Sequence, residues 1–470
     1  MIESGIKPII HRPITHRRVM KIALPIVLSN ATVPLLGAVD TGVIGQMGLA
    51  APIGAVGMGA VILASVYWIF GFLRMGTSGL AAQAHGKGDA SERTAILLRA
   101  LMVALGAGLF LIAVQSWLMT AALKLAPASA EVETLARQYL AIRIWGAPAT
   151  ISLYAITGWL VALERTRGVL VLQLWINGVN IALDLWFVLS LGWGVPGVAT
   201  ATLIAEWSGL FLGLWLCRDA FGPALKSAWA RIADAAALRI MLVVNRDIMI
   251  RSVVLQASFT TFIFLGAGYG DVTLAANQVL MQFLEIAAYG LDGYAFAAEG
   301  LVGQAVGAGS VLAVRRASII TMQWGFGGSF ALALAFGLSG PVLIDIMTTA
   351  PDVQQAARSY LPWLIAAPII GVASWIFDGI FIGATLTRDM RQAMILSVAV
   401  YLTALAVLVP MFGNHGLWAA LMVLNLARGI TMACRYTGAE RKAALYALKN
   451  RNAVDAPHPA ATAIANDSSP

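Results

Sequence analysis

Charged residues are scarce in this sequence. They make up 11% of its 470 residues, against about 25% in a typical soluble domain. Hydrophobic residues make up 59%. So little charge excludes a soluble globular enzyme with a single membrane anchor, and the composition predicts a polytopic membrane protein.

Cysteine and histidine are also rare. The two cysteines, Cys217 and Cys434, each lie near the end of an apolar segment and indicate neither a disulfide framework nor a metal cluster. The five histidines show no metal-ligand spacing. A membrane-embedded enzyme would need a His–Asp pair or metal ligands within its apolar segments, and none is visible. We therefore expect no enzyme, no metal and no cofactor.

Apolar runs long enough to cross a hydrocarbon core recur along the whole chain. The first is a full span without a small-residue cleavage site, so we expect no cleavable signal peptide. The fold class that follows is an all-α polytopic membrane protein with twelve transmembrane helices. The predicted spans are roughly 20–45, 52–83, 94–118, 137–161, 167–190, 196–217, 240–267, 273–304, 314–338, 354–385, 391–411 and 415–434.

The net charge of +8 is unevenly distributed. Every second loop is basic, and the alternate loops hold almost no cation except Lys124. The positive-inside rule places the basic loops and both termini in the cytoplasm, as an even number of spans requires. We expect a monomer in a bacterial inner membrane. The basic loops hold Lys87 and Arg93; Arg165 and Arg167; Arg218, Lys226 and Arg231; Arg315 and Arg316; Arg388 and Arg391.

The two halves of the chain resemble each other at a constant offset of 221 residues. Residues 79–88 (GLAAQAHGKG) match residues 300–309 (GLVGQAVGAG). Three matches in one register make chance a minority explanation. A six-helix unit present twice gives two parallel, pseudo-symmetric bundles around a central cleft, which suits alternating access. The other matches place Thr166-Arg167 on Thr387-Arg388 and Gly158 on Gly379.

The longest polar break divides these halves. The expected organisation is a basic leader at 1–16, a first lobe at 17–217, a cytoplasmic linker at 218–239, a second lobe at 240–435, and a tail at 436–470 that is basic and then, from about 453, disordered.

One acid, Asp40, lies inside the first apolar run. A carboxylate at membrane depth costs roughly 2.5–3.5 kcal/mol on insertion scales, so a chain keeps one mainly where it has a function. In the fifth span, Asn177, Asn180 and Asp184 share one helical face, and Thr202 lies early in the sixth. At about 1.5 Å per residue, the two acids lie roughly 28 and 26 Å along helices that both start at the cytoplasmic side.

Two carboxyl groups in one buried site hold a proton between them and titrate as a coupled pair. No Lys or Arg lies near either acid in the sequence, so a proton or a small cation is the natural partner. The offset of 221 places Asp40 on Thr261 and Asp184 on Leu405. Ion coupling is therefore expected in the first lobe alone.

Structural explanations remain open for the same side chains. A buried acid can bond to backbone at a proline kink. Interhelical hydrogen bonding explains Asn177 and Asn180 about equally well, and it is the better explanation for Thr202. Pro25 and Pro34 interrupt the hydrogen-bond ladder of the first helix, so we expect a hinge there that bends when its acid changes charge.

The second half has acids of its own. Glu285, Asp292 and Glu299 recur every seven residues in the eighth span, with Gln278 one step earlier. Asp378 lies in the middle of the tenth span. Such a stripe faces protein or a watery cleft, and a vestibule lined by acids attracts cationic substrates. Pairing of these acids with polar groups between the lobes is the alternative.

Together these residues resemble the multidrug and toxic compound extrusion (MATE) family, and its DinF-like branch most of all. The similarity covers residues 18–435. It implies two six-helix bundles around a central cleft, and export of drugs and organic cations against a proton or sodium gradient. It also implies that Asp40 is the protonation site. The matching residues are Ile22-Ala23-Leu24-Pro25, Asp40 fifteen residues later, Asn180, Asp184 and Thr202.

The NorM-like branch of that family instead binds its cation at second-lobe acids. Asp378 matches one of them, whereas Gln256 stands in place of the acid of the seventh helix. That departure favours proton coupling through the first lobe.

The sequence thus predicts a proton-coupled antiporter that exports cationic, amphipathic compounds by alternating access. Its expected partners are small molecules and the lipid bilayer, and no nucleic acid. A sodium-coupled exporter is one alternative, and a flippase for lipid-linked oligosaccharides is another. A flippase needs a cationic cleft to hold pyrophosphate, whereas the buried acids outnumber the candidate buried cations, Arg74 and Arg143.

Overall fold

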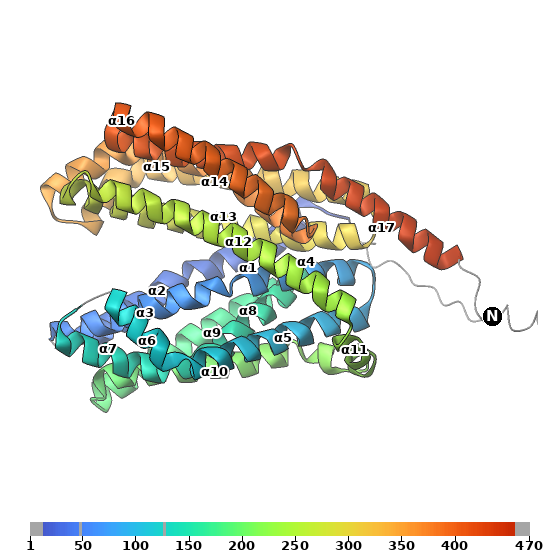
Figure 1. Ribbon diagram of the computed structural model, residues 1–470, viewed down its shortest axis with the longest axis horizontal. Coiled ribbons are helices and arrows are strands. Elements are labelled where there is room, and N and C mark those ends of the chain that lie inside the picture. Colours follow the sequence, from blue (N-terminus) through green and yellow to red (C-terminus); the bar gives the residue numbers. More distant parts are fainter. Residues whose placement is uncertain (1–12, 47–48, 126–127, 456–470) are drawn as a thin grey trace, which may run out of the picture.

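The computed structural model describes residues 13–46, 49–125 and 128–455, and within these ranges it contains helices and no strand. Its helices run lengthwise in two bundles that lie side by side (Figure 1). Helices from the first half of the chain form one bundle, and α12 to α16 form the other. The all-helical, two-lobed fold class is confirmed.

The first lobe contains α1 (His16–Ala31), α2 (Val33–Gly45), α3 (Ala50–Ile69), α4 (Phe72–Gly86), α5 (Ala90–Ala113), α6 (Gln115–Leu125), α7 (Ala130–Arg143), the 3₁₀ turn η1 (Ile144–Gly146), α8 (Ala147–Ala162), α9 (Thr166–Asp184), the π-helical segment η2 (Leu185–Ser190) and α10 (Gly194–Leu216). A connecting segment follows, with η3 (Arg218–Phe221) and α11 (Ala224–Ile232). The second lobe contains α12 (Ala235–Ala267), α13 (Asp271–Gly307), α14 (Val311–Met347), α15 (Pro351–Gly383) and α16 (Thr387–Ala433), and α17 (Thr437–Asp455) ends the described chain.

Nine helical stretches of the described residues are long and apolar enough to cross a membrane. The predicted first span is divided between α1 and α2. The last two predicted spans both lie within α16, where two helices join at the non-helical Gly413 (φ 55°, ψ −131°). The chain folds back there, since the hydroxyl groups of Ser397 and Thr431 lie 3.3 Å apart. The number twelve therefore stays a prediction.

The internal repeat is visible where the helices turn. Gly88 and Gly309, at equivalent positions, have φ of 76° and 71°, a conformation that glycine adopts without steric cost. Each precedes a helix cap: Asp89 caps α5 and Ser310 caps α14. We call the end of the molecule that contains these turns the basic end. Its cations include Arg18, Lys87, Arg165, Arg231 and Arg388.

The two lobes meet closely at the basic end. The side-chain amide of Gln83 donates to the carbonyl of Gly383, and that of Gln304 donates to the carbonyl of Ala162, both at 2.9 Å. No Cβ fits at Gly86, which packs on the carbonyl of Gln304, nor at the equivalent Gly307, which packs on the carbonyl of Gln83. This close approach joins α4 of the first lobe to α13 and α15 of the second.

The connecting segment is held on the first lobe. Helix α11 packs against α5, and Arg231 at its C-terminus pairs with Asp89 at 2.8 Å. Arg99, buried within α5, donates to the carbonyl of Arg231 at 2.5 Å. The predicted linker is thus an ordered part of the basic end.

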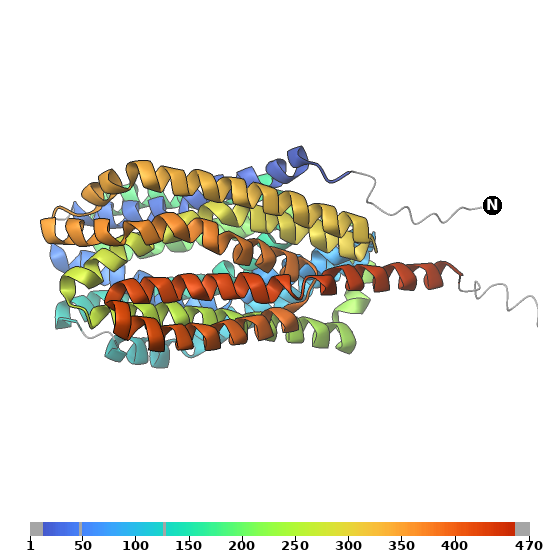
Figure 2. The same ribbon diagram turned by 90° about the horizontal axis from the view of Figure 1, so that it is seen from above.

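The basic part of the predicted tail forms α17, which extends past the bundles (Figure 2). Its Tyr446 hydroxyl donates to Oε1 of Gln83 at 3.2 Å, and Lys87 lies 4.2 Å from the Tyr446 ring centroid. Residues 453–455, expected to be disordered, end this helix. Residues 456–470 of the tail and 1–12 of the leader lie outside the described residues.

Candidate functional site

The first predicted span breaks between α1 and α2 at Thr32. Pro34 lies in the first turn of α2 and offers no N–H to the carbonyl four residues before it. Asn177 of α9 donates to the carbonyl of Thr32 at 3.2 Å. On the other side, Asn30 donates to the carbonyl of Tyr289 in α13 at 3.1 Å. The break is therefore tied to both lobes, whereas Pro25 lies inside the unbroken α1.

Four predicted residues meet in the first lobe. Asn180 donates to Oδ2 of Asp184 at 2.8 Å and to the hydroxyl of Thr202 at 3.3 Å. The carboxyl groups of Asp40 and Asp184 lie close enough together to interact directly. Asn180 and Asp184 are completely buried. We call these four residues the carboxyl cluster.

The carboxyl cluster has more acceptors than donors. Oδ1 of Asp40, of Asp184 and of Asn180 are buried and have no hydrogen-bond partner among the described residues. Two ionised carboxylates repel each other and neither can donate a hydrogen bond, so a proton shared between them favours their close approach. Buried acceptors are normally satisfied, and a proton or a small cation would satisfy these.

The chain is irregular immediately beyond Asp184. Helix α9 ends there, and the π-helical η2 follows. Gly192 and Gly194 then take positive φ angles of 67° and 58° before α10 begins. Single π-helical turns within helices often occur at functional sites. The irregular stretch positions Asp184 of α9 against Thr202 of α10.

A buried ion pair lies beside the carboxyl cluster. Arg143 of α7 binds Glu206 of α10 through two hydrogen bonds of 2.7 and 2.9 Å. Arg143 is also close enough to Asp40 and Asp184 to interact with both electrostatically. Glu206 was not among the residues predicted from the sequence. Its position one turn after Thr202, on the same helical face, was the available signal.

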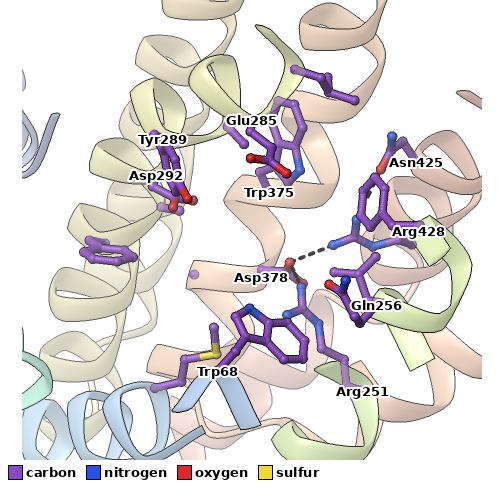
Figure 3. A pocket seen from close by; sticks show the side chains of 18 of the residues that line it. Trp68, Arg251, Gln256, Glu285, Tyr289, Asp292, Trp375, Asp378, Asn425 and Arg428 are labelled. Carbon is purple, nitrogen blue, oxygen red and sulfur yellow. Dashed lines mark hydrogen bonds and ion pairs between the residues drawn. The ribbon is translucent and has the colours of Figure 1, made fainter. Parts of the chain in front are cut away.

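The second lobe contains a cavity of about 490 Å³ (Figure 3). Trp68 of α3 and Arg74 of α4 also line it, so it reaches the first lobe. The structure brings together here all six residues that the sequence predicted for a substrate cleft, although substrate binding itself stays a prediction. They are Gln256, Gln278, Glu285, Asp292, Glu299 and Asp378.

Arginines neutralise part of the acidic wall. Arg74 pairs with Glu299 at 3.2 Å. Asp378 is bound by Arg251 of α12 and, at 2.8 Å, by Arg428 of α16. Arg251 and Arg428 were not predicted from the sequence, although a charge of either sign inside a span indicates function.

The sequence comparisons agree with this arrangement. Residues 25–186 and residues 248–409 each match the sequence model of the MatE family. The chain belongs to that family. The first MatE match contains Asp40 and Asp184, and the second contains Asp292 and Asp378. The family assignment made from the sequence is thus confirmed, and the two matches fall one in each lobe.

Relatives of this MatE protein span most of its length. DNA damage-inducible protein F of Escherichia coli (strain K12) is 38% identical over 426 residues, which cover 88% of this chain and 90% of that protein. A probable multidrug resistance protein NorM of Rhizobium meliloti (strain 1021) is 26% identical over 449 residues, which cover 88% of this chain and 91% of that protein. The bent form of the Vibrio cholerae MATE transporter VcmN superposes with a TM-score of 0.82 at 19% identity, over 92% of this chain and 98% of VcmN, and shares the fold.

Proposed function

We propose that this protein is a proton-coupled antiporter that exports cationic and amphipathic compounds from a bacterial cell by alternating access. The observation that carries the proposal is the close approach of the Asp40 and Asp184 carboxyl groups, beside buried oxygens that have no hydrogen-bond donor. The multidrug resistance protein among the relatives supports export of small molecules. In this proposal the basic end, with both termini, faces the cytoplasm of the inner membrane.

The mechanism links the proton to the break in the first span. In the outward-open state the carboxyl cluster takes up a proton and loses a negative charge. Asn177 lies one turn before Asn180 on α9 and holds the carbonyl of Thr32. A change at the cluster is therefore passed to the hinge between α1 and α2. The hinge is also tied to α13 through Asn30, so a movement of the hinge is passed to the second lobe. Substrate then leaves outward, and the proton is released inside.

Sodium coupling is the alternative form of the same proposal. The oxygens of Asp40, Asp184, Asn180 and Thr202 that accept a proton would also suit a hard cation. No group of three His, Cys, Asp or Glu side chains in the described ranges is arranged to hold a metal ion. The flippase alternative is not favoured, because the four acids that line the second-lobe cavity outnumber its three arginines, Arg74, Arg251 and Arg428.

Ethidium efflux from whole cells, with and without an uncoupler, tests the proposal. We expect the wild type to export ethidium until the uncoupler is added, and Asp40→Asn to export none at equal expression. Asp352→Asn, which changes an exposed acid at the start of α15, is the matched control and should export normally. Full export by the Asp40→Asn variant would exclude this mechanism.

A further inference from the structure

We propose that α17 is a latch that holds the basic end closed, by carrying Tyr446 from the second lobe onto Gln83 of the first. The latch deepens the proposed function, because a basic end that faces the cytoplasm has to open once in every transport cycle. It rests on the alternating movement of the lobes, and not on the coupling ion or on the substrate. A latch of this kind keeps the exporter closed to the cytoplasm until it is released.

Helix α17 is fixed to the second lobe. Glu440 binds Arg315 of α14 through two hydrogen bonds of 3.0 and 2.9 Å. Lys442 donates to the carbonyl of Thr385, in the connection between α15 and α16, at 3.3 Å. Ala443 is completely buried. With these contacts α17 moves together with the second lobe.

Tyr446 reaches from this helix to the first lobe. Its hydroxyl donates to Oε1 of Gln83 at 3.2 Å. The ammonium group of Lys87 lies 4.2 Å from the centroid of the Tyr446 ring, within the range of a cation–π interaction. Gln83 and Lys87 lie one turn apart at the end of α4. Because α4 and α17 belong to different lobes, opening of the basic end separates Tyr446 from both partners.

The tyrosine completes the hydrogen bonding of Gln83. The amide nitrogen of Gln83 donates to the carbonyl of Gly383 at 2.9 Å and to the hydroxyl of Thr385 at 3.0 Å, both in the second lobe. Both amide hydrogens are then used, and Oε1 still needs a donor. Gln83 is only 4% exposed, and a buried acceptor without a donor is costly. The hydroxyl of Tyr446 therefore stabilises the closed basic end.

The equivalent glutamine, Gln304, has the same arrangement with the lobes exchanged. Arg18 of α1, in the first lobe, donates to Oε1 of Gln304 in the second lobe at 3.3 Å. Each glutamine thus accepts a hydrogen bond from the first or last described helix of the chain, which is carried by the opposite lobe. The contact of Tyr446 is therefore one half of a repeated device, and not a chance contact of a helix that extends past the bundles.

Distances between two spin labels test this inference. The labels are attached through Arg167→Cys in the first lobe and Arg388→Cys in the second, which are exposed, equivalent positions. The full-length protein also carries Cys434→Ser, since Cys434 is exposed. Pulsed electron spin resonance in lipid nanodiscs then gives the ratio of molecules with an open basic end to those with a closed one. We expect Tyr446→Phe to raise this ratio about three- to tenfold, which corresponds to one hydrogen bond.

Two further variants locate the effect. Gln83→Ala should also raise the ratio, and adding Tyr446→Phe to it should raise the ratio no further, because the latch acts through Gln83. Tyr269→Phe is the matched control. It removes the hydroxyl of a tyrosine that is 39% exposed between α12 and α13 and makes no hydrogen bond to the described residues, so the ratio should stay at the wild-type value.

Hydrogen exchange in residues 437–447 shows whether α17 remains in place. We expect Tyr446→Phe to leave the protection of this segment unchanged, because the contacts of Glu440 and Lys442 with the second lobe are intact. Loss of protection would mean that Tyr446 holds α17 in place, instead of α17 holding Tyr446, and would overturn the inference.

An unchanged ratio in the Tyr446→Phe protein, or further opening in the double variant, would also overturn it. The measurement needs no gradient, so a failure of proton coupling leaves the result unaffected. If Gln83→Ala opens the basic end and Tyr446→Phe does not, the latch is refuted and alternating access is retained. If neither variant opens it, the latch and alternating access are both refuted.

Discussion

Gln83 and Gln304 make the same hydrogen bond in opposite directions across the two lobes. Each donates its side-chain amide to a backbone carbonyl of the other lobe at 2.9 Å. The acceptors, Gly383 and Ala162, are related by the same offset as the glutamines. This reciprocal pair, which we call the glutamine clasp, closes the basic end with twofold pseudo-symmetry. If the two lobes move by alternating access, the glutamine clasp has to open whenever the basic end opens.

Removing one half of the clasp should loosen the basic end locally. We expect Gln83→Ala to increase hydrogen exchange at residues 382–387, and Gln304→Ala to increase it at residues 161–166. Each change leaves a buried carbonyl without its donor, at a cost of about 1–3 kcal/mol. Gln354→Ala, which removes a hydrogen bond to the carbonyl of Thr348, is the control. Unchanged exchange in both clasp variants would show that the clasp does not hold the lobes.

A methyl group added between the lobes should be more damaging. In Gly307→Ala the new Cβ would collide with the backbone carbonyl of Gln83, and backbone cannot move aside as a side chain can. We expect efflux to be lost, because the basic end can no longer close. Gly106→Ala is the control, since nothing lies within 4 Å of its added Cβ. Normal efflux by the Gly307→Ala variant would contradict the closed arrangement.

Breaking the buried ion pair should change the pH dependence of transport. In Glu206→Gln, Arg143 loses its partner and its charge acts more strongly on Asp40 and Asp184. The ionised carboxyl cluster is then favoured, so the pH at which efflux is half maximal should fall. The unpaired buried arginine should also destabilise the protein by about 3–5 kcal/mol. An efflux profile at the wild-type pH would show that the pair has only a structural role.

The contact of α11 with the first lobe should survive mild acid. Burial alone would raise the pKa of Asp89, but the backbone N–H of Glu92 and the side chain of Arg231 outweigh it and hold that pKa below the ordinary 3.8. A carboxyl of this kind stabilises the fold above its ordinary pKa, and the stabilisation is lost as the pH falls through the lower value.

We therefore expect hydrogen exchange in residues 224–232, corrected for its intrinsic pH dependence, to be constant at neutral pH and to rise only below about pH 4. Asp89→Asn should remove this transition. Release of α11 between about pH 5 and 7 would contradict the assignment, and would place a pH-sensitive group at the basic end rather than at the carboxyl cluster.

Much of the first-lobe site could be predicted because helical periodicity places residues on faces. Asn180 and Asp184 share one face by their spacing, and an acid at the depth of Asp40 indicates a site. The prolines predicted a bend in the first span, and the chain breaks next to Pro34 but continues through Pro25. Spacing alone could not distinguish the two, because tertiary contacts such as that of Asn177 with the break decide which proline interrupts the helix.

The contacts between distant helices were beyond the sequence. Arg251 and Arg428 bind Asp378 from helices far away in the chain, and nothing local in the sequence indicates that pairing. The offset of 221 residues relates Gln83 to Gln304, but it does not show that each side chain reaches across to the other lobe. The sequence therefore indicates which groups have functions, and packing determines with which groups they pair.

Transport into proteoliposomes with separately imposed proton and sodium gradients tests the central claim most directly. The claim is that Asp40 and Asp184 load and release the coupling ion as a pair. We predict that a pH gradient alone drives uptake of the substrate in the wild type, and that Asp40→Asn and Asp184→Asn each abolish it. Uptake driven by a sodium gradient alone, or full proton-driven uptake in either variant, would contradict the account.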